Sequence, residues 1–250
     1  MKQLFCLLVC SISALWSMAQ RDVRDSVLTS PQILFSAVGQ LPFADMNDRF
    51  GVNAGLGVAF NIKTNHNWFY GVEGTFIFGK EVTEPGLLSN LLTDRGEIIS
   101  QNGQPAKLNI EERGWMVSLH CGKLFPIIGP NPNSGILIKG GIGFIQHKIR
   151  LEHQIHEITQ LEGDYLKGYD RLTNGLLLSQ FVGYNHMSNN RIANFIVGVD
   201  IYEGLTKNRR DLNYDTMERE DNLRLDGLAG LRIGWIIHMY PRTSNQFFYD

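Results

Sequence analysis

The sequence predicts an all-β protein, a transmembrane antiparallel up-and-down β-barrel of about eight strands with long outer loops. Three observations predict this fold class. Large apolar side chains alternate with small or polar ones in run after run, long polar connections alternate with shorter ones, and the chain starts like an exported protein. The chain has 250 residues, a length that suits one domain.

The clearest evidence is a hairpin pattern from Phe50 to Gly79. A side-chain period of two is typical of a strand, and two such runs joined by the polar turn 64–67 indicate a β-hairpin. One face of this hairpin is large and apolar, and the other is small or polar. The apolar face comprises Phe50, Val52, Ala54, Leu56, Val58, Phe60, Ile62, Trp68, Tyr70, Val72, Phe76 and Phe78.

The same alternation predicts six further strands. The pattern within 175–184 leaves its facing open, because three leucines are consecutive there. A ten-stranded variant, in which 147–174 forms another hairpin, stays open as well. The six expected strands are 32–40, 113–123, 136–146, 175–184, 193–201 and 223–239.

The lengths of the connections favour a membrane barrel over a soluble one. Segments 80–111, 147–174 and 203–222 are long and polar, whereas the connections between them are shorter, as in outer-membrane barrels with long outer loops and short periplasmic turns. The alternative is an exported soluble barrel of lipocalin type, with its apolar faces inside. Aromatic residues near the expected strand ends suggest two interfacial girdles: Trp68, Phe78, Trp115, Phe144, Tyr184, Tyr202 and Trp235.

The first residues resemble a secretory signal peptide. A basic Lys2, a short apolar core and small residues ending at Ala19 predict cleavage there. We therefore expect a signal peptide over 1–19, a barrel domain over 20–250 and location in the cell outer membrane. The formal net charge of −2 gives no electrostatic reason to expect nucleic acid as a partner.

Six ionisable residues fall on expected inward faces, where unpaired charges are energetically expensive. We interpret them as a structural ion network that fills the lumen, the alternative being a catalytic or proton-conducting set. No spacing typical of a catalytic constellation occurs, so no catalytic residue and no cofactor is predicted. The six are Glu73, His120, Lys139, Asp200, Asp226 and Arg232.

Histidines in the second long connection raise the question of a metal. The spacing of His147, His153 and His156 does not match a compact ligand set. We therefore interpret all three as residues of a solvated loop and predict no metal site. Arg209 and Arg210 could contact lipopolysaccharide phosphate or a partner carboxylate, the alternative being a salt bridge within the loop.

The runs 163–175 and 203–210, and Arg224-Leu225-Asp226 with Gly234-Trp235, resemble a family of small outer-membrane β-barrel proteins from Bacteroidota. The resemblance covers most of the chain after residue 19 and implies no catalytic residues. It implies partners in outer-membrane protein assembly or in type IX secretion. Candidate loop contacts within these runs are Tyr169, Asp170, Arg171, Arg209 and Arg210.

These observations favour a non-enzymatic, structural or accessory subunit of an outer-membrane assembly or secretion complex. Its expected surroundings are outer-membrane lipid and lipopolysaccharide. Two alternatives stay open from the sequence: a small pore or transporter, and an outer-membrane enzyme that modifies lipid.

Overall fold

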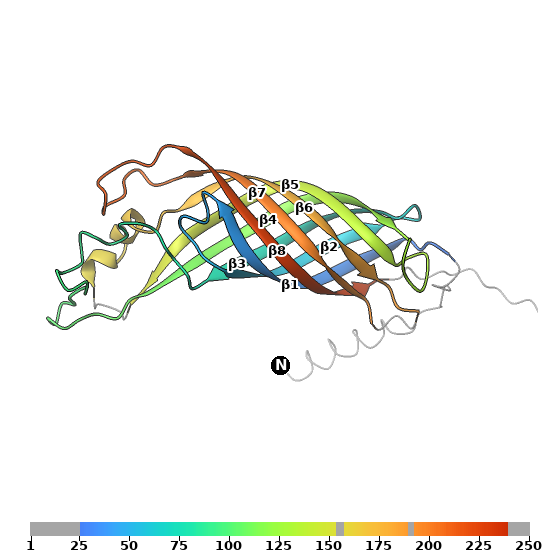
Figure 1. Cartoon of the computed structure of the whole chain (residues 1–250), viewed down its shortest axis with the longest axis horizontal. Coiled ribbons are helices and arrows are strands. Elements are labelled where there is room, and N and C mark those ends of the chain that lie inside the picture. Colours follow the sequence, from blue (N-terminus) through green and yellow to red (C-terminus); the bar gives the residue numbers. More distant parts are fainter. Residues whose placement is uncertain (1–25, 154–157, 190–192, 240–250) are drawn as a thin grey trace, which may run out of the picture.

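The computed structural model describes residues 26–153, 158–189 and 193–239 of the chain. Eight antiparallel strands form a closed ring in which each strand pairs with its sequence neighbours and β1 pairs with β8 (Figure 1). The predicted fold class is therefore confirmed, with eight strands rather than ten among the residues that the structure describes. The strands are β1 (Ser30–Ala44), β2 (Asn53–Lys63), β3 (Trp68–Gly79), β4 (Asn109–Phe125), β5 (Gly135–Glu152), β6 (Thr173–His186), β7 (Phe195–Asn208) and β8 (Leu223–His238).

Two short 3-10 helices, η1 (Thr159–Leu161) and η2 (Tyr165–Gly168), lie in the connection between β5 and β6. Within the described ranges, no helix has the length and apolar character needed to cross a membrane. The expected signal peptide, 1–19, lies outside the described residues.

The alternation of side chains gives the barrel an apolar outer surface. Leu119, at the middle of β4, is 65% exposed, and its partners on the two neighbouring strands, Val72 and Ile142, are exposed as well. The consecutive leucines of β6 also alternate, because Leu176 and Leu178 are exposed whereas Leu177 is buried. Large apolar residues thus cover the outside of all eight strands.

Some strands are longer than the sequence pattern suggested. The prediction ended a strand at Ile201 and began a charged loop at Glu203, but β7 continues to Asn208. Residues 203–208 pair with β6, and 203–207 also pair with β8, so backbone pairing on both sides extends the strand through a polar segment.

Two aromatic residues face the interior, contrary to prediction. Phe50 precedes β2 and is completely buried against the ring of His147. Tyr202 is buried, with its hydroxyl 2.5 Å from Nη2 of Arg232. Its neighbour Ile201 faces outward, so the period of two places Tyr202 inside and removes it from the expected girdle.

The long connections all lie at one end of the barrel, the loop end, and the short ones lie at the other (Figure 1). Segment 45–52, between β1 and β2, also lies at the loop end. The leucine-rich segment 87–92 forms no helix; Leu88 is buried in an apolar cluster with Leu87 and Leu91 packed against it.

Glycines permit close approach between strands on the inner face. A Cβ added at Gly143 would lie 2.0 Å from the carbonyl oxygen of Val117, and one added at Gly175 would lie 1.9 Å from that of Leu205. Both distances are far below contact distance, so the sheet can curve this tightly only because a side chain is missing there.

The interior is divided into three layers that follow a spacing of four residues along several strands. On β3, the apolar Phe69 is followed by the charged Glu73 and then by the apolar Ile77, all three buried. β4 and β8 repeat this order of apolar, ionisable and apolar side chains toward the loop end, with Leu124, His120 and Met116 and with Ile236, Arg232 and Leu228. A polar layer is thus enclosed between two apolar ones.

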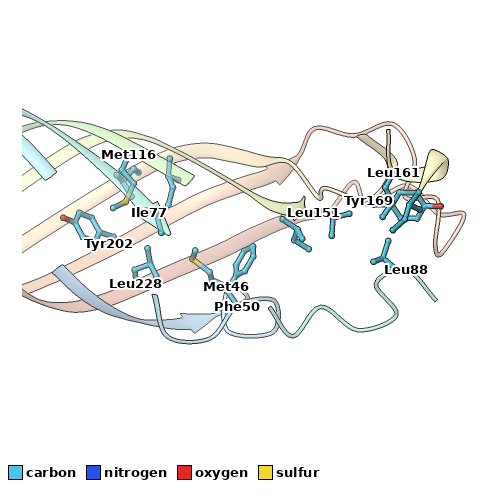
Figure 2. Packing of buried hydrophobic residues seen from close by; sticks show 14 of the residues in the cluster. Met46, Phe50, Ile77, Leu88, Met116, Leu151, Leu161, Tyr169, Tyr202 and Leu228 are labelled. Carbon is cyan, nitrogen blue, oxygen red and sulfur yellow. The ribbon is translucent and has the colours of Figure 1, made fainter. Parts of the chain in front are cut away.

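The apolar layer on the loop side continues out of the barrel. Figure 2 shows Met116, Ile77 and Tyr202 within the strands and Leu161 and Leu88 among the loops, all in one cluster. The other apolar layer closes the end with the short turns and comprises Leu34, Ala59, Phe69, Leu124, Leu137, Phe181, Ile196 and Ile236.

A substitution by arginine on the outer face of the barrel tests which face of the sheet contacts lipid. If Leu119 faces hydrocarbon, Leu119→Arg should lower the free energy of unfolding by about 2–4 kcal/mol. The measurement is denaturant unfolding from phospholipid vesicles. Ile127→Arg, on an exposed short turn, is the control and should change stability little. Equal stability of both variants and the unaltered chain would contradict contact with lipid.

Candidate functional site

Four of the predicted lumen residues form a single ion network in the middle of the barrel, here called the charge layer: Glu73, Lys139, Asp200 and Arg232. Arg232 lies 2.5 Å from Glu73 through Nη2 and 2.6 Å from Asp200 through Nε. Nζ of Lys139 lies 3.5 Å from the other carboxylate oxygen of Glu73. Two carboxylates face two cations, so the charge layer is neutral overall, as buried charges require.

The other two predicted lumen residues are not part of the charge layer. His120 lies beside it, and Asp226 lies outside it. His120 shares a hydrogen bond of 2.6 Å with the side-chain oxygen of Asn61. Asp226 lies closer to the loop end, 2.9 Å from Nε2 of His147, and accepts a hydrogen bond from Thr206. All six predicted residues are buried, but they belong to different groups along the barrel axis.

His147 corrects the interpretation of the histidine cluster. It faces inward near the loop end of β5 and is buried, whereas the sequence suggested a solvated loop. The reason is that β5 extends to Glu152, so His147 still follows the inward phase of the strand. His156 lies outside the described residues, and among those described no group of three or more His, Cys, Asp or Glu could hold a metal ion.

Tyr202 and His147 are two of the lumen residues that the sequence interpretation missed, since Glu112 is buried on the inner face as well. Both were assigned by the composition of their neighbourhood, Tyr202 to a girdle and His147 to a loop. Counting in steps of two from Asp200 and Lys139 would have placed both inside.

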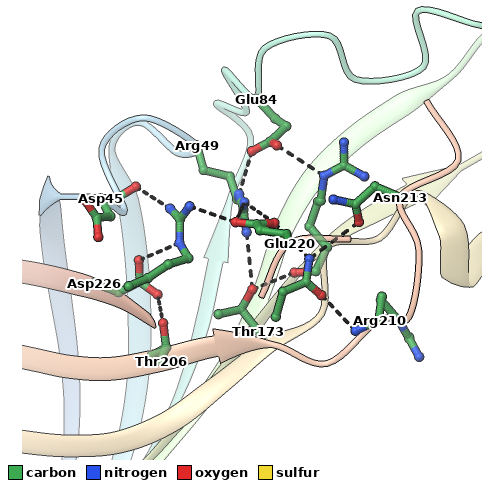
Figure 3. A network of polar contacts seen from close by, with 12 residues as sticks. Asp45, Arg49, Glu84, Thr173, Thr206, Arg210, Asn213, Glu220 and Asp226 are labelled. Carbon is green, nitrogen blue, oxygen red and sulfur yellow. Dashed lines mark hydrogen bonds and ion pairs between the residues drawn. The ribbon is translucent and has the colours of Figure 1, made fainter. Parts of the chain in front are cut away.

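The connections at the loop end are joined by a second ion network, the cap network: Arg49, Glu84, Arg171, Asp215 and Glu220. Glu84 accepts hydrogen bonds from Arg49 at 2.5 Å and from Arg171 at 3.1 Å. Arg171 also binds both oxygens of Asp215, at 2.6 and 2.7 Å. Arg49 donates to Glu220 at 3.0 Å (Figure 3).

The cap network links four separate connections of the chain, 45–52, 80–108, 153–172 and 209–222. Arg171 is 1% exposed, so its charge is removed from water and depends on its two carboxylate partners. Breaking such a buried pair costs about 3–5 kcal/mol, because the remaining charge is left uncompensated. The cap network therefore holds the loops against one another.

The environment of the cap network favours the charged forms of Arg49 and Glu220. Burial alone would lower the pKa of Arg49, but the charges of Glu84 and Glu220 outweigh it and raise the pKa above its ordinary value. Burial alone would raise the pKa of Glu220, but Arg49, Asn208 and Arg224 hold it below its ordinary value.

The five predicted loop contacts divide into buried and accessible residues. Tyr169, Asp170 and Arg171 are buried, so these three stabilise the loop end and do not present their side chains to a partner. Arg210 is partly exposed and forms a bidentate pair with Asp170, at 2.5 and 2.7 Å. Arg209 is exposed and donates to Asn174 at 2.6 Å.

A double-mutant cycle tests whether the charge layer is one electrostatic unit. Glu73→Gln and Lys139→Met should each destabilise the barrel by about 3 kcal/mol, because each leaves a net charge in the lumen. The double variant keeps the neutral Arg232–Asp200 pair and should lose less stability than either single variant. Denaturant unfolding from vesicles measures all four proteins.

The exposed pair Lys207–Asp221 provides the matched control cycle, with an expected coupling below about 1 kcal/mol. Additive losses in the Glu73–Lys139 cycle would contradict a coupled charge layer.

Proteolysis tests the cap network. Arg171→Met removes the contacts to both Glu84 and Asp215 and should make cleavage by trypsin after the exposed Arg95 about tenfold faster or more, since local opening governs proteolysis. Arg219→Met, which removes an exposed arginine paired with Asp221, is the control. Unchanged cleavage after Arg95 in the Arg171 variant would show that the loops are held by other contacts.

Comparisons with known proteins found similar solved structures but no match to a protein-family model or to a curated sequence. Among solved structures, the chain is similar to Neisserial surface protein A, at 8% identity and a TM-score of 0.43, covering 83% of this chain and 96% of the other. It is also similar to Ail of Yersinia pestis, at 12% identity and a TM-score of 0.39, covering 84% and 99%.

A third similar structure is the outer membrane protein OprG from Pseudomonas aeruginosa, at 10% identity and a TM-score of 0.37, covering 87% of this chain and all of the other. All three TM-scores lie below 0.5, so the fold assignment rests on the closed ring of strands in the chain itself.

Proposed function

We propose that this protein is a non-enzymatic outer-membrane β-barrel that acts as a structural or accessory subunit and binds a protein partner through its loop end. The observation that carries the proposal is the combination of a filled lumen with loops joined by the cap network. Such a barrel offers a preformed surface on one side of the membrane and no passage through it.

The outer surface supports a membrane location. Exposed large apolar side chains are found on every strand of the ring, whereas soluble monomers rarely expose contiguous apolar patches above a few hundred Å². A closed barrel also satisfies its backbone hydrogen bonds internally, which a lipid environment requires.

The interior argues against a pore. The charge layer lies between two apolar layers, and an eight-stranded barrel is narrow enough for side chains to fill. A cavity of about 10 Å³ beside Glu73, His120 and Lys139 has room for about one water molecule. If lipid covers the outside of the barrel and side chains fill its lumen, the loop end is the part of the protein that a partner on that side of the membrane can reach.

The loop end has apolar residues that a partner could cover. Met217 is 70% exposed and Tyr165 is 64% exposed, and both lie in connections joined by the cap network. Apolar side chains on loops that are already held in place favour binding, because little backbone conformational entropy is lost on association. The proposed partner is a protein of outer-membrane assembly or type IX secretion, the setting implied by the sequence resemblance.

Photo-cross-linking in native membranes tests the proposal. A photoreactive amino acid in place of Met217 or Tyr165 should give one cross-linked polypeptide from both positions, identified by mass spectrometry. The same amino acid in place of Ile127, exposed on a short turn at the opposite end, is the control and should not capture that polypeptide.

Absence of an adduct from both loop positions, in a protein that is folded in the membrane, would contradict the partner. Single-channel conductance of the unaltered protein in a planar bilayer would contradict the filled lumen and favour a pore.

A further inference from the structure

A groove of about 690 Å³ lies on the outside of the barrel near its loop end. Apolar side chains and charged side chains both line it. The apolar ones are Phe76, Leu151, Leu161 and Leu166, and the charged ones include Arg113, Lys148, Arg150, Glu152 and Glu162.

The groove lies where the apolar surface of the barrel ends. Phe76 is exposed on the outside of β3 and pairs with Trp115 on β4. The ring of Trp115 lies 5.4 Å from that of Phe144. Two residues further toward the loop end on the same two strands, the outward positions are occupied by Arg113 and Gln146. Aromatic residues followed by cations mark the boundary between hydrocarbon and headgroups.

Two cations are placed directly opposite each other at this boundary. Arg113 on β4 and Lys148 on β5 are register partners, and both side chains face outward, since Glu112 and His147 are buried on the inner face. Like charges in directly opposed positions destabilise a sheet. A bound anion between the two side chains would turn this repulsion into attraction.

Neighbouring carboxylates leave one of these cations unpaired. Arg113 pairs with Glu111, and Arg150 pairs with Glu152. Lys148 forms no ion pair in the part of the chain that the structure describes. Its ammonium group and the remaining donors of Arg113 can therefore bind a further oxyanion.

We propose that this groove binds the phosphate group of an anionic membrane lipid. Arg113 and Lys148 bind the phosphate oxygens, because guanidinium and ammonium groups are the usual partners of phosphate. An acyl chain of the same lipid lies along Phe76, on the apolar surface of the barrel. The inference rests on the proposed membrane location of the barrel, and it identifies a site for lipid on the outside of the loop end.

Lipid binding to the purified full-length protein tests the site. The protein, refolded in a neutral detergent, is titrated with lipid A carrying two phosphates and with the same lipid after phosphatase treatment, and native mass spectrometry counts the bound lipids. The phosphorylated lipid should bind, and Arg113→Gln combined with Lys148→Gln should weaken this binding about tenfold or more. Lys148→Arg should retain it.

The control replaces Lys80 and Lys107 by Gln. Both are exposed cations of the connection between β3 and β4 and neither lines the groove, so the net charge changes equally while binding should stay unchanged. Titration with phosphatidylglycerol tests how specific the site is. A general site for anionic lipids binds phosphatidylglycerol as well as it binds lipid A, whereas a specific site prefers lipid A. Either result supports a phosphate site.

Two results would overturn the proposal: equal binding of the dephosphorylated lipid, or equal weakening in the control variant. A co-purified polypeptide that is lost on substitution of Arg113 and Lys148, with lipid binding unchanged, would show that the groove binds protein. Since folding in detergent is verified first, by the heat-dependent migration of the barrel on gels, failure of the barrel itself is distinguished from failure of the site.

Discussion

The neutral charge layer at the middle of the barrel is the constraint on which the rest of the interior depends. Arg232 contacts Glu73 and Asp200, and Lys139 supplies the second positive charge. A narrow barrel leaves too little space for water to solvate these groups, so each charge must be balanced by side chains from other strands. The four residues come from β3, β5, β7 and β8, and their pairing therefore fixes strands on opposite sides of the ring relative to one another.

The apolar layers complete this arrangement by excluding water from both sides of the charge layer. On the loop side the apolar cluster extends from Ile77 and Met116 in the strands to Leu88 and Leu161 in the connections. The loops are thus packed on the barrel through the same cluster that fills its interior. The cap network then joins these loops to one another, so barrel and loop end form a continuous packed body (Figures 2 and 3).

A protein built in this way exposes two different surfaces, and each suits a different binding role. The loop end presents residues such as Met217 and Tyr165 on loops that are already ordered, which suits a protein partner. The groove beside Arg113 and Lys148 lies on the side of the barrel, at the level where headgroups of surrounding lipid are expected. A lipid in the groove and a partner on the loops could therefore be bound at the same time.

The fold class, the approximate strand positions and the facing of most side chains could be predicted from the amino-acid sequence. Each depends on a local pattern, the period of two, that can be read without knowledge of tertiary contacts. The six lumen residues from Glu73 to Arg232 could be named for the same reason. The extension of β7 to Asn208 could not, because pairing with both neighbouring strands, rather than apolar alternation, maintains it.

Which of these residues contact one another became clear from the three-dimensional arrangement of the strands. Strand stagger around the ring brings Arg232 to Glu73 but leaves Asp226 nearer the loop end with His147, and no pattern within one strand contains this information. The cap network joins residues as distant in the chain as Arg49 and Glu220. Such contacts depend on how the loops fold over the barrel, because ion pairs between long connections have no characteristic spacing in the sequence.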